Sequence, residues 1–270
     1  MTETPVAYPL STALGRFGIA PVVDSPDPFV SSMPLAGLVN PATGAPTVGP
    51  LAVLVDHAGG LVNHYRKAAD EWTLTSELTL EITPDALQVV ADSPDLVAVA
   101  TARPTGDRGK ADALGCCDIT VGDAVIGIGT VRSVYITRAG EHPTEWPPAE
   151  VEGRRPTDLG EIMAIDVDDA QVIHQRQNPA LNNTLGIVHG GVSAAGLELA
   201  ASAVLNAGRT GATLRTASLR VNYLRPFFSG GESRYVGTVL RVGGRTGVAE
   251  ARAIGADGET ALLARVTAYV

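Results

Sequence analysis

The chain has 270 residues, of which 45% are hydrophobic and 18% charged, with a formal net charge of −9 and a pI of about 5.0. This length accommodates one large domain or two of modest size, and the hydrophobic fraction is sufficient for a packed core. The negative charge and the lack of a Lys/Arg run argue against nucleic-acid binding. No apolar stretch reaches transmembrane length, so the sequence predicts no membrane association.

The N-terminus and the cysteines predict the compartment. Residues 1–20 lack the basic segment followed by an apolar one that marks a signal peptide. Cys116 and Cys117 are adjacent and would point to opposite faces of a strand, which is typical of a reducing environment. We therefore expect a cytoplasmic protein. The five His residues lack metal-ligand spacing and Cys support, so we expect no metal site.

The first half of the chain predicts an arm followed by an α+β unit. Residues 1–28 are punctuated by proline, which indicates an extended N-terminal arm. Residues 51–66 have the apolar spacing of a helix. Alternating or β-branched runs predict strands at 29–39, 72–82, 86–102, 110–121 and 124–136. The polar, Pro-rich residues 137–160 are interpreted as a linker between domains 29–136 and 161–270.

The second half repeats this order. It predicts a strand at 162–175, a helix at 190–206 and strands at 214–224, 233–242, 246–254 and 260–270. Asp56 and Glu198 are each the one acid in the middle of a helix and lie 142 positions apart (198 − 56). Pro84 and Pro226 each end the strand after the helix, also 142 apart (226 − 84). The chain is therefore predicted to be an internal duplication of an α+β unit.

A polar, Gly-punctuated turn leads into the second helix. It runs from Asn183 to Gly191, and the helix that follows consists mostly of small residues interrupted by Glu198. Small side chains let another backbone come close, so we expect this helix to be buried against a partner. The Gly190-Gly191 step leaves free N–H groups at the positive end of the helix, which suits a developing oxyanion.

This motif, Asn-x5-His-Gly-Gly with an acid nine residues after the His, resembles the hotdog-fold acyl-CoA thioesterases. The most similar group is the phenylacetyl-CoA-type (PaaI-like) branch. The resemblance covers about 110 residues of the C-terminal half, in which Asn183, His189, Gly190, Gly191 and Glu198 occupy matching positions. It implies two tandem hotdog domains, each a long central helix wrapped by an antiparallel β-sheet. It also implies water-orienting hydroxyls at Thr216 and Ser202.

The N-terminal half departs from the pattern. Thr47-Val48-Gly49 stand where the C-terminal half has His189-Gly190-Gly191, and Pro41 stands where Asn183 is expected. Pro50 begins the helix and supplies no N–H donor. The half nevertheless keeps its acid, Asp56.

Helix geometry decides how the halves combine. Gly190 and Glu198 are eight residues apart (198 − 190), so they lie about 12 Å apart along one helix. A base or nucleophile must approach the reacting carbonyl to about 3–3.5 Å, so the acid must come from a neighbouring antiparallel helix. One composite site would join Asn183, His189 and Gly190 to Asp56, and we expect this site to be productive. The second would join Val48 and Gly49 to Glu198, which is either a second active site or a relic that only pairs across the interface.

In the productive site, Gly190 N–H and Asn183 would polarise the thioester carbonyl. Asp56 would act as general base or as nucleophile, with Thr75 (or Thr73 or Ser76) holding the water. The remaining assignments are that His189 orients the turn rather than acts as a base, and that Gly191, Lys110 and Arg245 contact coenzyme A. An ion pair of Asp56 with His57 or His64 is the structural alternative.

The sequence therefore predicts hydrolysis of an acyl-CoA, with no cofactor beyond the CoA of the substrate. A non-catalytic acyl-CoA sensor is the alternative, because the N-terminal half is degenerate. A hotdog hydratase is a weaker one, because the Asp-x-Asn-Pro-x-His segment is missing. We expect a homo-oligomer, with a dimer favoured and a trimer as the alternative. The sequence leaves the acyl group open.

Overall fold

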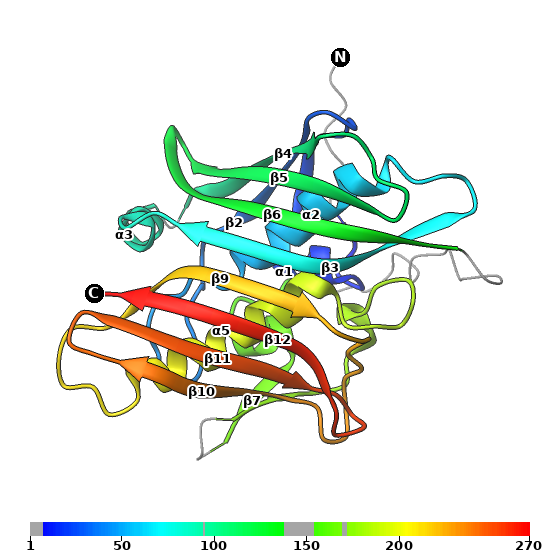
Figure 1. Ribbon diagram of the computed structural model, residues 1–270. Coiled ribbons are helices and arrows are strands. Elements are labelled where there is room, and N and C mark those ends of the chain that lie inside the picture. Colours follow the sequence, from blue (N-terminus) through cyan, green and yellow to red (C-terminus); the bar gives the residue numbers. More distant parts are fainter. Residues whose placement is uncertain (1–7, 94, 138–153, 169–171) are drawn as a thin grey trace.

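The computed structural model describes residues 8–93, 95–137, 154–168 and 172–270 (Figure 1). Within these residues, twelve strands form one antiparallel sheet in the order β1-β2-β4-β5-β6-β3-β9-β12-β11-β10-β8-β7. Two long helices, α2 (Leu51–His64) and α5 (Gly190–Asn206), pack on its inner face, each against the strands of its own half. The predicted α+β class with two helix-and-sheet units is confirmed.

The remaining elements follow the chain. The strands are β1 (Ala20–Val23), β2 (Phe29–Pro34), β3 (Glu71–Ile82), β4 (Val97–Thr105), β5 (Asp112–Val121), β6 (Ala124–Thr137), β7 (Ile165–Val167), β8 (Ile173–Gln175), β9 (Arg215–Tyr223), β10 (Arg234–Val242), β11 (Thr246–Ile254) and β12 (Thr260–Tyr269). The short helices are α1 (Ala13–Phe17), α3 (Ala86–Asp92), α4 (Leu159–Met163) and the 3₁₀ turn η1 (Pro179–Leu181).

The sheet is pseudo-symmetric about its centre. Its order reads the same from both ends when each of β1–β6 is exchanged for its counterpart among β7–β12. At the centre, β3 pairs with β9, so that Leu78 faces Val221 and Leu80 faces Leu219. These pairs map onto each other if residue i of β3 corresponds to residue i + 141 of β9. The predicted duplication therefore builds one continuous sheet from two units joined edge to edge.

The two long helices form the core and run antiparallel to each other. The middle of α2 contacts the start of α5 through Asp56 and Gly191, and the middle of α5 contacts the segment before α2 through Glu198 and Thr47. A side chain at Gly191 would place its Cβ 2.5 Å from the Cα of Val53, so only glycine fits at this crossing. This close approach is what the small residues of α5 permit.

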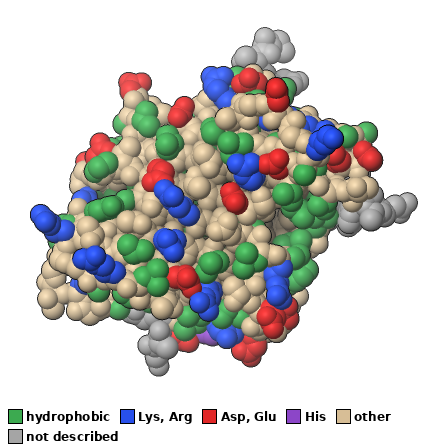
Figure 2. All heavy atoms as spheres, viewed as in Figure 1, with side chains coloured by type: hydrophobic (Ala, Val, Ile, Leu, Met, Phe, Trp, Pro, Cys, Tyr) green, Lys and Arg blue, Asp and Glu red, His purple; other side chains and the backbone are tan. Residues whose placement is uncertain are grey.

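The outer face of the sheet is solvated. Figure 2 shows Lys/Arg and Asp/Glu side chains of both signs scattered over this face, and ion pairs such as Arg220–Glu81 (3.0 Å) link neighbouring strands. An antiparallel sheet with one covered face is stable in this arrangement. No helix among the described residues is long and apolar enough to span a membrane.

Two predicted strands are wrong in part. Residues 86–92 form α3, and the strand begins only at Val97, because Ala86 and Val90 bury one helical face at i, i+4 spacing. A short apolar run does not separate helix from strand by periodicity alone. Residues 162–175 are divided among the end of α4, β7 and β8. Most of the predicted linker, residues 138–153, lies outside the described residues.

The predicted extended arm is also wrong in part. Thr12 caps α1 by accepting the Gly15 N–H (3.1 Å), and Gly18, at φ 68°, ends the helix. Leu14 and Phe17 are buried. The second half has a corresponding short helix, α4, which precedes β7 as α1 precedes β1. The duplicated unit therefore begins before residue 29. A Thr N-cap followed by Gly was the available sequence signal.

Candidate active site

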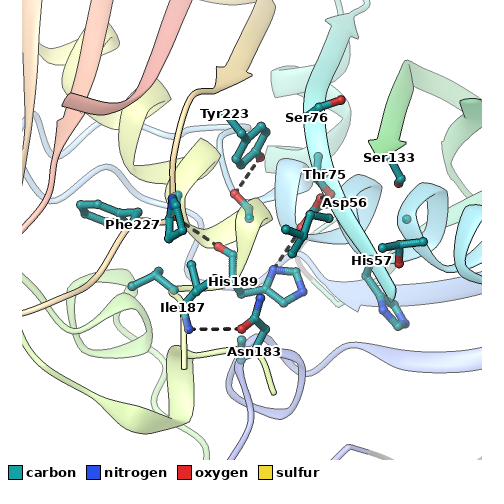
Figure 3. A pocket seen from close by; sticks show the side chains of 18 of the residues that line it. Asp56, His57, Thr75, Ser76, Ser133, Asn183, Ile187, His189, Tyr223 and Phe227 are labelled. Atoms are coloured by element: carbon teal, nitrogen blue, oxygen red, sulfur yellow. Dashed lines mark hydrogen bonds and ion pairs between the residues drawn. The ribbon is translucent and has the colours of Figure 1, made fainter. Parts of the chain in front are cut away.

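A cavity of about 520 Å³ lies where the two halves meet, beside Asp56 and the start of α5. The N-terminal half lines it with parts of α2, β3 and β6. The C-terminal half contributes the loop before α5, the first turn of α5 and the end of β9. Figure 3 shows Asp56, Thr75 and His189 pointing toward one another in this cavity from three different elements.

Asp56 is held from both sides. Its Oδ2 accepts the Gly191 N–H of α5 (2.7 Å), and its Oδ1 accepts the hydroxyl of Thr75 on β3 (2.8 Å). The residue is only 7% exposed, yet it lines the cavity. Two fixed donors therefore orient the carboxylate, and the helix end that holds it lies 135 positions further along the chain.

His189 is the N-cap of α5. Its Nδ1 lies 3.2 Å from the Gly191 nitrogen and 3.3 Å from Asp56 Oδ2. Neutral imidazole with a bare Nδ1 accepts the Gly191 N–H, whereas a protonated Nδ1 donates to Asp56. In either state the His189 ring lies in contact with both the Gly191 nitrogen and the Asp56 carboxylate. The orienting role of His189 stays a prediction.

Tyr223, at the end of β9, fixes the Gly190-Gly191 peptide. Its hydroxyl donates to the Gly190 carbonyl (2.9 Å), and in a trans peptide the following N–H points the opposite way, toward Asp56. Burial, and then the charge of Asp56, raises the pKa of Tyr223, so the phenol remains a donor. Among the described residues, the Gly190 N–H itself has no acceptor, although Gly190 lines the cavity. Tyr223 is not among the residues predicted from the sequence, where its one signal is a phenol at the end of a buried strand.

Asn183 presents its amide group to the same cavity. Its Oδ1 accepts the N–H groups of Leu185 (2.9 Å) and Ile187 (3.2 Å), which determines the side-chain orientation. Its Nδ2 has no acceptor among the described residues, and Asn183 lines the cavity. The turn therefore brings two unused donors, from Asn183 and Gly190, to the same cavity as Asp56.

His57 and His64 do not pair with Asp56. His57 Nε2 bonds the Tyr8 hydroxyl (3.1 Å), and His64 Nδ1 bonds the Thr73 hydroxyl (2.8 Å). Burial, followed by the nearby His189, lowers the pKa of His57 to about 3. Burial, followed by the charge of Lys67, lowers the pKa of His64 to about 4. Both rings are neutral at pH 7, so the predicted alternative of an ion pair with either is wrong.

The second acid has a different environment. Glu198 accepts the hydroxyls of Thr47 (2.8 Å) and Thr216 (2.5 Å), is 1% exposed and does not line the cavity. A Cβ at Gly49 would lie 2.5 Å from Glu198 Oε2, so the carboxyl fills the space in front of that turn. Burial raises the pKa of Glu198, and the bonds from Thr216 and Thr47 oppose this shift. The second predicted site, around Glu198, therefore has no opening to the cavity.

The N-terminal half does keep an Asn in its turn, which corrects the alignment of Pro41 with Asn183. Asn40 Oδ1 accepts the Ala42 N–H (2.9 Å), as Asn183 Oδ1 accepts the Leu185 N–H. The N-terminal loop is one residue longer, with seven steps from Asn40 to Thr47 (47 − 40) against six from Asn183 to His189 (189 − 183). Asn40 Nδ2 donates to the Leu199 carbonyl (3.0 Å), so this amide is already used.

The other predicted residues lie elsewhere. Thr216 bonds Glu198, and neither Ser202, Lys110 nor Arg245 lines the cavity. Arg245 lies at the β10–β11 turn, where its carbonyl accepts the Val270 N–H. That is the far end of β12 from the cavity-lining residue Leu262, roughly 24 Å away at 3.4 Å per residue.

The cation at this cavity is a different one, Arg225. Among the described residues that line the cavity, it is the single Lys or Arg. Its guanidinium makes loose ion pairs with Asp257 (4.0 Å) and Glu259 (3.8 Å). No group of His, Cys, Asp and Glu in the described part of the chain could hold a metal ion.

Part of the chain that contains this site matches a family model. Residues 185–262 match the thioesterase superfamily. The match contains the His189 turn, α5, Tyr223 and Arg225. This match supports a thioester hydrolase. Among proteins with curated functions, none matches the chain in sequence.

Solved structures resemble the chain over nearly its whole length. The TesB protein of Mycobacterium avium subspecies paratuberculosis has a TM-score of 0.61 at 11% identity and covers 92% of this chain and 95% of its own. Acyl-CoA thioesterase II TesB2 of Mycobacterium marinum has a TM-score of 0.60 at 11% identity, covering 89% and 90%. The 12:0-ACP thioesterase of Umbellularia californica has a TM-score of 0.55 at 12% identity, covering 89% and 93%. These similarities establish the tandem hotdog fold, and the PaaI-like branch stays a prediction.

Proposed function

We propose that the protein hydrolyses acyl-CoA thioesters at a composite site built from both halves. One observation carries this proposal. Asp56 of the N-terminal half lies against the first turn of α5 and shares a cavity with the unused donors of Gly190 and Asn183. This is the composition that thioester hydrolysis requires: a carboxylate, and donors for the oxygen on which charge develops.

The donors polarise the substrate. A thioester carbonyl in the cavity would accept the Gly190 N–H, reinforced by the positive end of α5, and the Nδ2 amide of Asn183. As the tetrahedral species forms, the added negative charge on this oxygen strengthens both bonds. Tyr223 positions the adjoining peptide through its hydrogen bond to the Gly190 carbonyl.

Asp56 supplies the base or the nucleophile. As a base it takes a proton from water while the water oxygen bonds the carbonyl carbon; the C–S bond then breaks and the proton leaves with the thiol. As a nucleophile its carboxylate oxygen bonds the carbonyl carbon, the C–S bond breaks and the thiolate leaves, taking a proton from solvent; water then hydrolyses the acyl-aspartyl anhydride to the acid and the free carboxylate. A single turnover in ¹⁸O-water separates the routes, because only the anhydride route can place unlabelled aspartyl oxygen in the acid.

The carrier part of the substrate is the finer proposal. The similar structures include acyl-CoA and acyl-ACP thioesterases by name, so both carriers are to be tested. Arg225, half exposed at the cavity, replaces Lys110 and Arg245 as the residue proposed to meet a phosphate of the carrier. We also propose a homo-oligomer, a dimer rather than a trimer, to be measured by light scattering.

The experiment follows free thiol released from a panel of acyl-CoAs by wild type, Asp56→Asn and Glu198→Gln. We expect kcat to fall by about 10²–10⁴-fold in Asp56→Asn. Glu198→Gln should stay near the wild-type rate, because Glu198 lies outside the cavity. The reverse pattern would sink the composite site. Tight acyl-CoA binding without turnover in all three proteins would identify a sensor instead.

A further inference from the structure

Helix α2 contains two consecutive glycines, Gly59 and Gly60, in its interior. Glycine is the least favourable residue at such a position apart from proline, so each one needs a reason. Gly59 has one in the packing of the protein. A Cβ there would lie 2.8 Å from Val131 Cγ2 and 3.3 Å from Cys117 Sγ, so the sheet leaves no room for a side chain.

Gly60 has no such reason. Apart from its chain neighbours and the backbone of its own helix, no protein atom lies within 4 Å of a Cβ built at this position, and its backbone is helical, so any ordinary residue could stand there. Gly60 does line the cavity, one turn beyond Asp56 on the same face of α2. The space that its missing side chain leaves therefore opens beside the acid, about 6 Å further along the helix.

The charges around the cavity indicate which part of a substrate would occupy this space. The end near Gly60 is lined by Leu61, His64 and Trp72, and His64 is neutral at pH 7. The end near the C-terminal half contains Arg225. An anionic carrier is attracted to Arg225, the one cation that lines the cavity among the described residues, which leaves the end lined by Leu61 and Trp72 for the acyl group.

We propose that Gly60 is a specificity-determining residue, whose missing side chain makes room for the acyl chain beyond its first carbons. This inference rests on the proposed thioester hydrolysis. Position 60 corresponds to Ser202 in α5 (60 + 142), so a glycine is not required by the duplicated helix itself. The substrate class that fits is an acyl chain long enough to reach one helical turn past Asp56.

The test compares wild type, Gly60→Ala and Gly60→Leu with acetyl-, hexanoyl- and dodecanoyl-CoA. Ala and Leu are good helix formers, so we expect the Tm of Gly60→Ala to rise by about 2–4 °C. We expect kcat/KM for dodecanoyl-CoA relative to acetyl-CoA to fall at least about tenfold in Gly60→Leu and less in Gly60→Ala. A raised Tm shows that lost activity is not lost folding. Gly59→Ala is the matched control, and its Tm should fall.

Two outcomes would overturn the inference. An equal loss for all three substrates in Gly60→Leu would mean that the space holds the carrier, and unchanged kinetics for all three would make Gly60 an ordinary surface glycine. If the wild type releases no thiol, the proposed function fails on its own. In that case the role of Gly60 is tested by measuring the binding of the same acyl-CoAs by calorimetry. A loss of affinity in Gly60→Leu that grows with acyl-chain length would support an acyl pocket at Gly60. An affinity in Gly60→Leu that is uniform across chain lengths would refute it.

Discussion

Asp56 and Glu198 occupy twin positions in a duplicated helix, but only one of them opens on a cavity. Asp56 binds a helix N–H and the Thr75 hydroxyl and faces space large enough for a ligand. Glu198 binds two threonine hydroxyls and is buried to 1% exposure. The same scaffold thus carries an accessible acid in one half and a sealed hydrogen-bond cluster in the other.

The difference arises in the turns that face the acids. In the first site the turn supplies the Gly191 N–H to Asp56, whereas in the second the Gly49 N–H donates to Thr47 Oγ1 and the Thr47 hydroxyl donates to Glu198. The extra methylene of glutamate carries its carboxyl across to Gly49. A duplicated site can thus close through its turn while its acid remains.

The largest expected effect is on stability, from substitutions of the glycines at which each turn contacts the long helix of the other half. In Gly191→Ala the new Cβ would collide with the backbone of α2 near Val53, which cannot move independently, so we expect a loss of about 3 kcal/mol. In Gly49→Ala the collision is with the end of the Glu198 side chain, which can rotate, so the loss should be about 1 kcal/mol. Urea unfolding measures both, and equal losses would contradict the comparison.

The threonines that bond each acid should separate activity from stability. Thr75→Val removes a donor to Asp56, and we expect kcat to fall by about tenfold with the fold retained. Thr216→Val removes a donor to Glu198, so it should cost about 1–2 kcal/mol of stability and leave kcat close to wild type. Thiol release and thermal unfolding are measured on both. A kcat loss in Thr216→Val would show that the Glu198 site is active.

Tyr223 tests the positioning of the turn. Its twin in β3 is Ile82 (223 − 141), which has no hydroxyl, so only the Asp56 site has this bond. Tyr223→Phe should lower kcat by about fivefold at unchanged KM, since one neutral hydrogen bond is lost. Tyr269→Phe, at an exposed tyrosine, is the control. A change confined to KM would mean that Tyr223 binds substrate directly.

The smallest effect is a pH dependence of stability. Burial raises the pKa of Glu198 in the folded state, so between its unfolded value of about 4.3 and the folded pKa the native state holds more protons. The contribution of Glu198 to stability therefore falls as pH rises through this window. Glu198→Gln lacks this dependence, and its Tm relative to wild type should rise by about 2–4 °C from pH 4 to pH 8. A difference that is constant with pH would refute the raised pKa.

The sequence by itself determined the duplication, both long helices and most strands. Helix α5 was predicted at its observed bounds and α2 within two residues, because apolar periodicity and flanking glycine or proline are local properties of the chain. It also brought Asp56 to the start of α5, since the 12 Å separation within one helix excluded Glu198 from that turn.

Only the tertiary structure decided what surrounds each acid. That Glu198 is sealed, that Tyr223 holds the Gly190 peptide and that Gly60 faces open space all depend on contacts between segments far apart in the chain. Periodicity shows which face of a helix is buried, but not whether protein or a ligand will fill the space beside it. That outcome is set by how side chains of both halves pack at their junction.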